Sequence, residues 1–140
     1  MLKVTRRAIL LGSAAAVAAP SARPRAAPAE HKEFIDAAFR MKEEAVRAGD
    51  QPYGAVLVMD VRIIGFGPSR VVLKGDATAH AEREAIREAQ ARLGRRDLTG
   101  AVLYSTSRAC PQCEAAAAEA DVARMIHGRD TVDAGRPRRL

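Results

Sequence analysis

Two short stretches of the sequence, about thirty residues apart, carry side chains that could bind one metal ion together. His80-Ala81-Glu82 supplies an imidazole and a carboxylate, and Cys110-Pro111-Gln112-Cys113 supplies two thiols. One imidazole and two thiolates form a ligand set that zinc binds tetrahedrally, with the fourth position open to water. A glutamate two residues beyond the histidine can stay off the metal and move protons for that water. The pattern therefore predicts a zinc site with an activated water.

The predicted helices explain how these residues could meet. One helix is expected from about Thr78 or Ala79 to Leu93, with Gly94 as its end, and the next from Cys110 to about Ala120. His80 then lies in the first turn of one helix and both cysteines in the first turn of the other. The positive end of a helix dipole favours thiolate over thiol, and residues three apart share one helical face.

Each stretch alone has simpler interpretations. A lone His-Ala-Glu on a helix is ordinary surface, and a lone Cys-x-x-Cys can be a metal site, a disulfide or a dithiol redox pair. The redox interpretation predicts a strand followed by the Cys-x-x-Cys and a helix, which this chain also has. It leaves His80 and Glu82 without a role, however. The combination favours the metal site.

Hydrophobic periodicity predicts alternating helices and strands from Glu30 onward. A first helix carries an apolar stripe from Phe34 to Ala45, and strands are expected at 55–59, 62–66, 101–104 and 122–127. A tight turn at 60–61 makes the first two strands an antiparallel hairpin. The predicted fold is α/β, a three-layer α/β/α sandwich with a mixed sheet of four to five strands.

Charge is distributed unevenly along the 140 residues, whose formal net charge is +6. Residues 1–29 hold five basic side chains and no acidic one, and the basic tail 136–140 holds three more. The domain between them, 30–135, has 15 basic and 17 acidic residues. This balance lacks the basic footprint of a nucleic-acid-binding protein, so we expect a small-molecule partner.

The first 29 residues have the pattern of a targeting segment. Thr5-Arg6-Arg7-Ala8-Ile9-Leu10 resembles the twin-arginine export motif, and the apolar run that follows is too short to span a bilayer. Small residues at Ala27 and Ala29 suit a cleavage site. We therefore expect a mature protein that begins near Glu30, resides in a bacterial periplasm and has no membrane segment after cleavage.

Several segments together resemble the cytidine and deoxycytidylate deaminase superfamily, in its branch of guanine deaminases and tRNA adenosine deaminases. H-x-E followed by C-x-x-C is the signature of zinc deaminases. Around it, residues 49–56 (GDQPYGAV) resemble the family's P-F-G-A-V strand opening, and residues 75–82 (GDATAHAE) resemble its D-P-T-x-H-A-E. Residues 96–104 and 123–128 continue the similarity, which runs from about Glu33 to Gly135.

The resemblance implies a cytidine deaminase-type fold and a role for each site residue. His80, Cys110 and Cys113 would hold Zn²⁺, and Glu82 would pass a proton from the water to the ring nitrogen and the departing amine. Backbone amides near Ala81 and Cys110 would stabilise the tetrahedral intermediate. Further pocket contacts are expected from these residues: Tyr53, Gly54, Ala55 and Ser69.

The chain also departs from the family pattern. Arg108-Ala109 stands where relatives carry Glu-Pro, and Ser69 stands where they carry an asparagine that contacts the base or ribose. No fifth strand or closing helix is evident before Leu140, which predicts an exposed sheet edge. A homodimer, common in this family, could cover that surface.

The sequence thus predicts hydrolytic deamination of a nucleobase or nucleoside, with a guanine-type purine favoured and ammonia as product. One alternative is a zinc-stabilised binding domain whose catalysis is impaired; Glu82 argues against it, whereas Ser69 and Arg108 argue for it. The other alternative is the Cys-x-x-Cys dithiol oxidoreductase.

Overall fold

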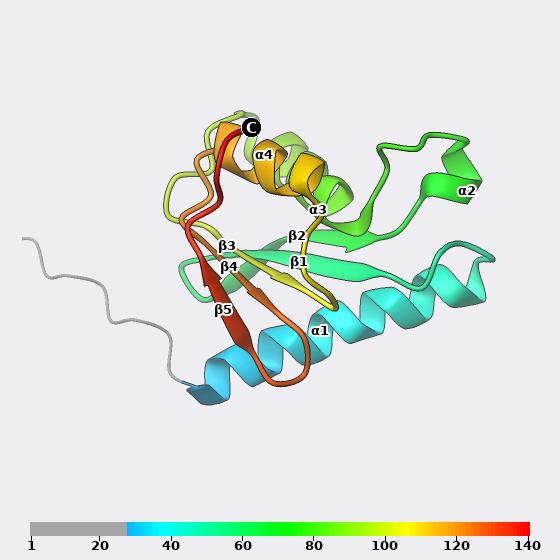
Figure 1. Cartoon of the computed structure of the whole chain (residues 1–140), viewed down its shortest axis with the longest axis horizontal. Helices are drawn as coiled ribbons and strands as arrows, with labels where there is room; N and C mark the ends of the chain where they lie inside the picture. The colour runs from blue at the N-terminus through cyan, green and yellow to red at the C-terminus, as the bar shows by residue number, and fades with distance from the viewer. Residues whose placement is uncertain (1–27) are drawn as a thin grey trace, which may run out of the picture.

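Five strands in residues 28–140 form one mixed sheet at the centre of this part of the chain. The structure is a computed structural model and describes residues 28–140 (Figure 1). The strand order is β2-β1-β3-β4-β5, with β3 and β4 parallel and the other neighbours antiparallel. The strands are β1 (Gly54–Met59), β2 (Arg62–Pro68), β3 (Val102–Ser105), β4 (Arg124–His127) and β5 (Val132–Gly135). The predicted α/β class with an antiparallel first hairpin is confirmed.

Helices cover both faces of this sheet, as Figure 1 shows. α1 (Pro28–Arg47) packs on one face, while α3 (Ala81–Leu93) and α4 (Pro111–Glu119) pack on the other. Each interface has its own buried cluster, the α1 side around Phe34 and Tyr104 and the opposite side around Leu57 and several alanines. No helix within residues 28–140 is long and apolar enough to cross a membrane.

The β1–β2 hairpin follows directly from its sequence. Five of the six residues of β1 are buried, as expected for an apolar run that has neighbours on both faces. Asp60 and Val61 form the turn with φ values of 50° and 57°, which is the left-handed pairing of a two-residue hairpin turn. This hairpin fixes the end of β2 beside the start of α3.

Two glycines allow the helices to approach the sheet closely enough to position the site. A Cβ atom at Gly67 would overlap the carbonyl oxygen of Ala81, the first residue of α3. A Cβ atom at Gly54 would overlap the carbonyl oxygen of Ala38 in α1. Only glycine fits such contacts between backbones, so Gly67 fixes the distance of the α3 start from the sheet.

The structure corrects the expected end of the chain and one loop. A fifth strand, β5, does follow β4 and pairs with it antiparallel, with Arg124 of β4 in an ion pair with Asp133. Its sequence gives no strand signal, because Val132, Asp133 and Ala134 are all exposed and carry no apolar alternation. A short helix, α2 (Val71–Lys74), lies between the strand expected at 62–66 and the helix expected from about Thr78, where no element is expected.

The predicted domain boundaries, after residues 29 and 135, stay predictions. α1 begins at Pro28, two residues before the expected start of the domain, and the predicted twin-arginine segment otherwise lies outside the described residues. At the other end, the basic tail returns to α4, where the backbone N–H and Nε of Arg138 both donate to Oε1 of Glu114 at 3.0 and 3.1 Å. The location of the protein in the periplasm stays a prediction.

Candidate active site

His80 and Cys110 occupy equivalent positions at the starts of two neighbouring helices. Each is the N-cap residue, His80 of α3 and Cys110 of α4, with nearly identical extended backbone (φ/ψ of −63°/154° and −67°/162°). They therefore lie one residue before the first turn in which the sequence placed them. Pro111 follows Cys110 at the first helical position, where its fixed φ suits a helix start. An N-cap side chain faces the third helical residue, which in α4 is Cys113.

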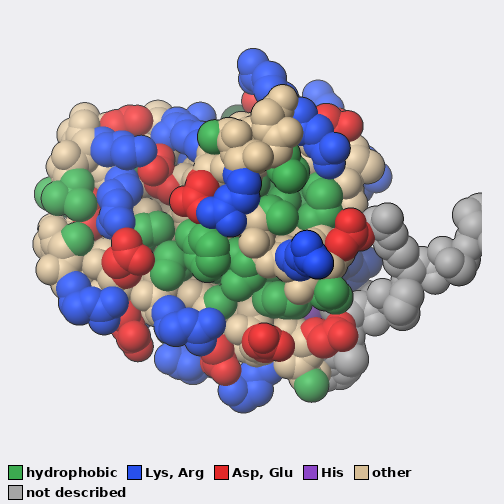
Figure 2. Space-filling view, turned by 180° about the vertical axis from the view of Figure 1, so that it is seen from behind, with side chains coloured by type: hydrophobic (Ala, Val, Ile, Leu, Met, Phe, Trp, Pro, Cys, Tyr) green, Lys and Arg blue, Asp and Glu red, His purple; other side chains and the backbone are tan. Residues whose placement is uncertain are grey.

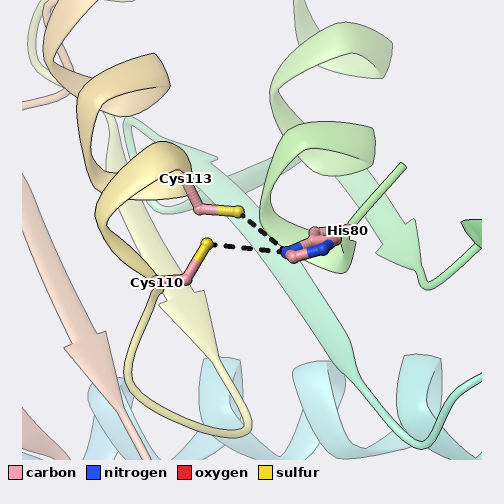
Figure 3. Close-up of side chains that lie close together, drawn as sticks. All are labelled: His80, Cys110 and Cys113. Carbon is pink, nitrogen blue, oxygen red and sulfur yellow. Dashed lines mark hydrogen bonds between the residues drawn. The ribbon is translucent and has the colours of Figure 1, made fainter. Parts of the chain in front are cut away.

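The three predicted metal ligands converge on one point (Figure 3). Nδ1 of His80 lies 3.6 Å from Sγ of Cys110 and 3.3 Å from Sγ of Cys113. All three donor atoms lie within 4.8 Å of one another. Tetrahedral bonds of about 2.0 Å to nitrogen and about 2.3 Å to sulfur separate such atoms by about 3.5 Å. The residues are thus positioned as zinc ligands by both chemistry and spacing.

Glu82 lies beside these ligands, in the first turn of α3. Its side chain is 7% exposed and lines the same cavity as His80 and Cys110. Burial raises the pKa of the Glu82 carboxyl, an effect that its own backbone N–H, His80 and Cys113 partly offset. A carboxyl with a raised pKa holds a proton more readily than a solvated one, which suits a group that accepts a proton and returns it.

The thiol of Cys113 is fully buried behind this cavity. Burial raises its pKa, and the neighbouring Glu82 carboxylate and Cys110 raise it further. Zinc binds the thiolate form, so metal binding at this site must release protons.

The cavity beside the three ligands has a volume of about 510 Å³ and is lined by some of the predicted pocket residues. Tyr53, Ser69 and Ala81 line it, and their contacts with a substrate stay predictions. Gly54 and Ala55 do not line it. Gly54 lies against α1, and Ala55 is fully buried in the core under α3, because β1 runs through the middle of the sheet. The other lining residues are Gln51, Pro52, Ser107 and Arg108.

With this geometry in place, similarity to known proteins decides the family. Residues 28–129 match the cytidine and deoxycytidylate deaminase zinc-binding region, a match that covers more than half of the chain and includes all three candidate ligands. The chain belongs to this deaminase family.

Relatives within the deaminase family act on different substrates. The tRNA-specific adenosine deaminase of Agrobacterium fabrum is 39% identical over 100 residues, covering 71% of this chain and 66% of that protein. The guanine deaminase of Bacillus subtilis is 42% identical over 84 residues, covering 59% and 54%. The X-ray structure of guanine deaminase from Bacillus subtilis superposes with a TM-score of 0.68 at 37% identity, covering 70% of this chain and 63% of that one. The chain thus spans less than two-thirds of these relatives' lengths.

Ser69, which replaces the asparagine expected in the family, is held by a carboxylate that the sequence analysis did not single out. Ser69 is 1% exposed, and its hydroxyl donates to Oδ1 of Asp50 at 2.9 Å. Its backbone N–H donates to the carbonyl of Tyr53 at 3.1 Å. Because Asp50 takes the only hydroxyl hydrogen, Ser69 offers lone pairs to the cavity and acts there as an acceptor.

Asp50 also anchors the segment that follows Ser69. It accepts the backbone N–H of Gln51 at 2.8 Å through Oδ1 and that of Leu73 at 2.9 Å through Oδ2. Burial raises the pKa of Asp50, but these hydrogen bonds together with that of Ser69 outweigh it and lower the pKa to about 2. Asp50 is therefore a positioning residue for the pocket wall. Its sequence signal, an aspartate between a helix end and a proline, indicates only a turn.

Replacing Asp50 by asparagine is expected to destabilise the protein at neutral pH. A carboxylate with a lowered pKa stabilises the fold above its ordinary value of 3.8, and this contribution is lost as the pH falls toward about 2. Thermal melts of wild type and Asp50→Asn should therefore differ most at pH 7 and converge between about pH 4 and 2. Asp130→Asn, at an exposed position, provides the matched loss of charge. A melting difference for Asp50→Asn that stays constant over this pH range would contradict the assignment.

Proposed function

We propose that the protein is a zinc-dependent hydrolytic deaminase of a nucleobase or nucleoside, with a guanine-type purine as the favoured base. The observation that carries the proposal is the placement of a buried carboxyl, Glu82, in the same 510 Å³ cavity as the His80 and Cys110 ligands. A purely structural metal site has no need of this carboxyl. The cavity also leaves room for a ring beside it.

Each residue of the site has its own role in the proposed reaction. Zinc, when bound to His80, Cys110 and Cys113, supplies a water whose pKa is lowered toward neutrality. Glu82 would carry one proton from the attacking water to the ring nitrogen. It would then carry a second proton, from the hydroxyl group formed on the ring carbon, to the leaving amine. Ala81 lines the cavity, and its backbone N–H, at the start of α3, has no carbonyl partner within the helix. This N–H would stabilise the negative charge that develops on the substrate.

The substrate is proposed to be a small molecule and not a folded RNA, although several relatives are tRNA-specific adenosine deaminases. Residues 30–135 carry slightly more acidic than basic side chains. Figure 2 shows one face of the molecule on which lysines and arginines alternate with acidic residues around a central group of hydrophobic side chains. A protein that holds a polyanion usually presents a basic stripe instead.

The dithiol oxidoreductase alternative fits the site less well. Both thiols point toward the same imidazole nitrogen, as Figure 3 shows, and the carboxyl of Glu82 lies next to them. A redox pair needs neither group. The homodimer predicted from the sequence stays a proposal.

Ammonia release by the zinc-loaded protein tests the proposed function. The panel comprises guanine, adenine, cytosine, their nucleosides, and an adenosine-containing tRNA anticodon stem-loop. We expect release from purines, with guanine or guanosine first. No release from any compound by protein with one zinc per chain would support the impaired binding domain. Release from the stem-loop alone would overturn the small-molecule assignment.

A further inference from the structure

A second cavity, of about 300 Å³, lies directly behind one wall of the active site. The wall is the segment from Ser105 to Cys110. Ser107 and Cys110 line the active-site cavity, Ser105 and Ala109 line the second cavity, and Arg108 lines both. Three arginines contribute to the second cavity, namely Arg108, Arg136 and Arg138.

The positive charge of this second cavity exceeds its negative charge. Glu114 is the one carboxylate among its lining residues, and it binds Arg138 at 3.1 Å. Neither Arg108 nor Arg136 is part of an ion pair among residues 28–140. Two guanidinium groups are thus available for an anion, whereas the hydroxyl of Ser105 donates its hydrogen to the carbonyl of Ser107 at 2.7 Å and takes no part.

The other large hollow of the described chain, between α1 and α3, provides a contrast. Its charged residues neutralise one another in ion pairs, with Arg70 bound to Glu44 at 2.8 Å and Lys74 bound to Glu84 at 2.6 Å. Arg87 also binds Glu84, at 3.0 Å. A smaller cavity of about 180 Å³ on α3 and α4 is also lined by arginines outside these ion pairs, Arg83 and Arg96, but it shares no residue with the active-site cavity. Among these cavities, the second cavity is the one that shares an arginine with the active site, Arg108.

Arg108 connects this cavity to the chemistry of the site. It lies two residues before the zinc-ligand candidate Cys110, at the rim of the cavity that contains Glu82. An anionic group that Arg108 binds can therefore belong to the molecule whose base lies in the active-site cavity. The planar guanidinium group suits the oxygens of a phosphate, which it can bind through two parallel hydrogen bonds.

We propose that Arg108, supported by Arg136 and Arg138, binds the terminal phosphate of a nucleoside monophosphate whose base is deaminated beside Glu82. This inference rests on the proposed function and narrows its substrate class to nucleotides. Three arginines against one carboxylate give the second cavity a net positive charge, which suits a terminal phosphate with nearly two negative charges. An RNA backbone needs an open basic track that continues past the site in both directions.

The ratio of kcat/KM for GMP to that for guanosine tests the phosphate contact, with AMP and adenosine as a second pair. We expect wild type to prefer the nucleotide. Arg108→Gln should lower the ratio about 10- to 100-fold, mainly through KM, since a charged hydrogen-bonded contact is lost. Arg92→Gln removes the same charge from an exposed ion pair with Glu88 on α3 and should leave the ratio unchanged.

Binding to an inactive variant separates this inference from the proposed function. Zinc-loaded Glu82→Gln is titrated with GMP, guanosine and inorganic phosphate by calorimetry, with and without Arg108→Gln. Binding of GMP that depends on Arg108 supports the phosphate site, whether or not wild type releases ammonia. If wild type releases no ammonia, the deaminase function alone is rejected. Turnover of guanosine with equal or lower activity on GMP would overturn the phosphate site and leave the deaminase function standing. Activity on the stem-loop above that on monophosphates would also overturn it.

Discussion

Glu82→Gln is expected to keep its zinc and to lose turnover by about 100- to 10,000-fold, the usual contribution of a general acid–base. Glutamine has nearly the shape of glutamate but cannot take a proton from water or return one to the amine. Since Glu82 is not one of the three converging donors, its replacement leaves the ligand set intact. The measurements are zinc content by elemental analysis and the rate of ammonia release.

A second glutamate on the same helix provides the control. Glu84 also lies in the first turn of α3, but its carboxylate binds Lys74 and Arg87 away from the zinc ligands. Glu84→Gln should retain most of the activity of wild type. Equal turnover by Glu82→Gln and wild type would show that the proposed proton transfer is wrong.

Cys113→Ser is expected to lose both zinc and activity. Cys113 is fully buried in the first turn of α4. A water molecule therefore cannot take the place of its sulfur as a zinc ligand unless the start of α4 opens. Zinc favours thiolate sulfur over a neutral hydroxyl, and a bound metal stabilises the folded state in proportion to its affinity. The zinc content should fall from near one per chain to near zero, and the melting temperature should no longer rise with added zinc.

Removal of the metal from wild type serves as the control for this variant. Wild type treated with a strong chelator should melt near the temperature of untreated Cys113→Ser and should recover activity when zinc is restored. Full zinc content in Cys113→Ser would mean that another residue completes the site, which would contradict the assigned ligands.

The parts of the fold that the sequence predicted are those with strong local patterns. The apolar run of β1 and the turn at Asp60 and Val61 define the hairpin without reference to distant residues. β5 has no such pattern, because its exposed residues are ordered by pairing with β4 and by the contact of Asp133 with Arg124. Its existence depends on tertiary contacts.

The residues of the site also divide into those with a local sequence signal and those without one. His80, Glu82 and the two cysteines could be found because metal chemistry restricts residue type and spacing, and the structure places them together. The role of Asp50 could not be found, since its partners Ser69 and Leu73 lie 19 and 23 residues away. The second cavity brings Arg108 together with Arg136 and Arg138, which follow β5. The sequence indicated only a basic tail for that segment.

The most direct test of the central claim is X-ray absorption at the zinc edge of the purified protein. With His80, Cys110 and Cys113 as ligands, we predict one zinc per chain with two sulfur neighbours at about 2.3 Å and two nitrogen or oxygen neighbours at about 2.0 to 2.1 Å. A spectrum without sulfur neighbours would contradict this account, as would a folded, metal-free protein in which Cys110 and Cys113 form a disulfide.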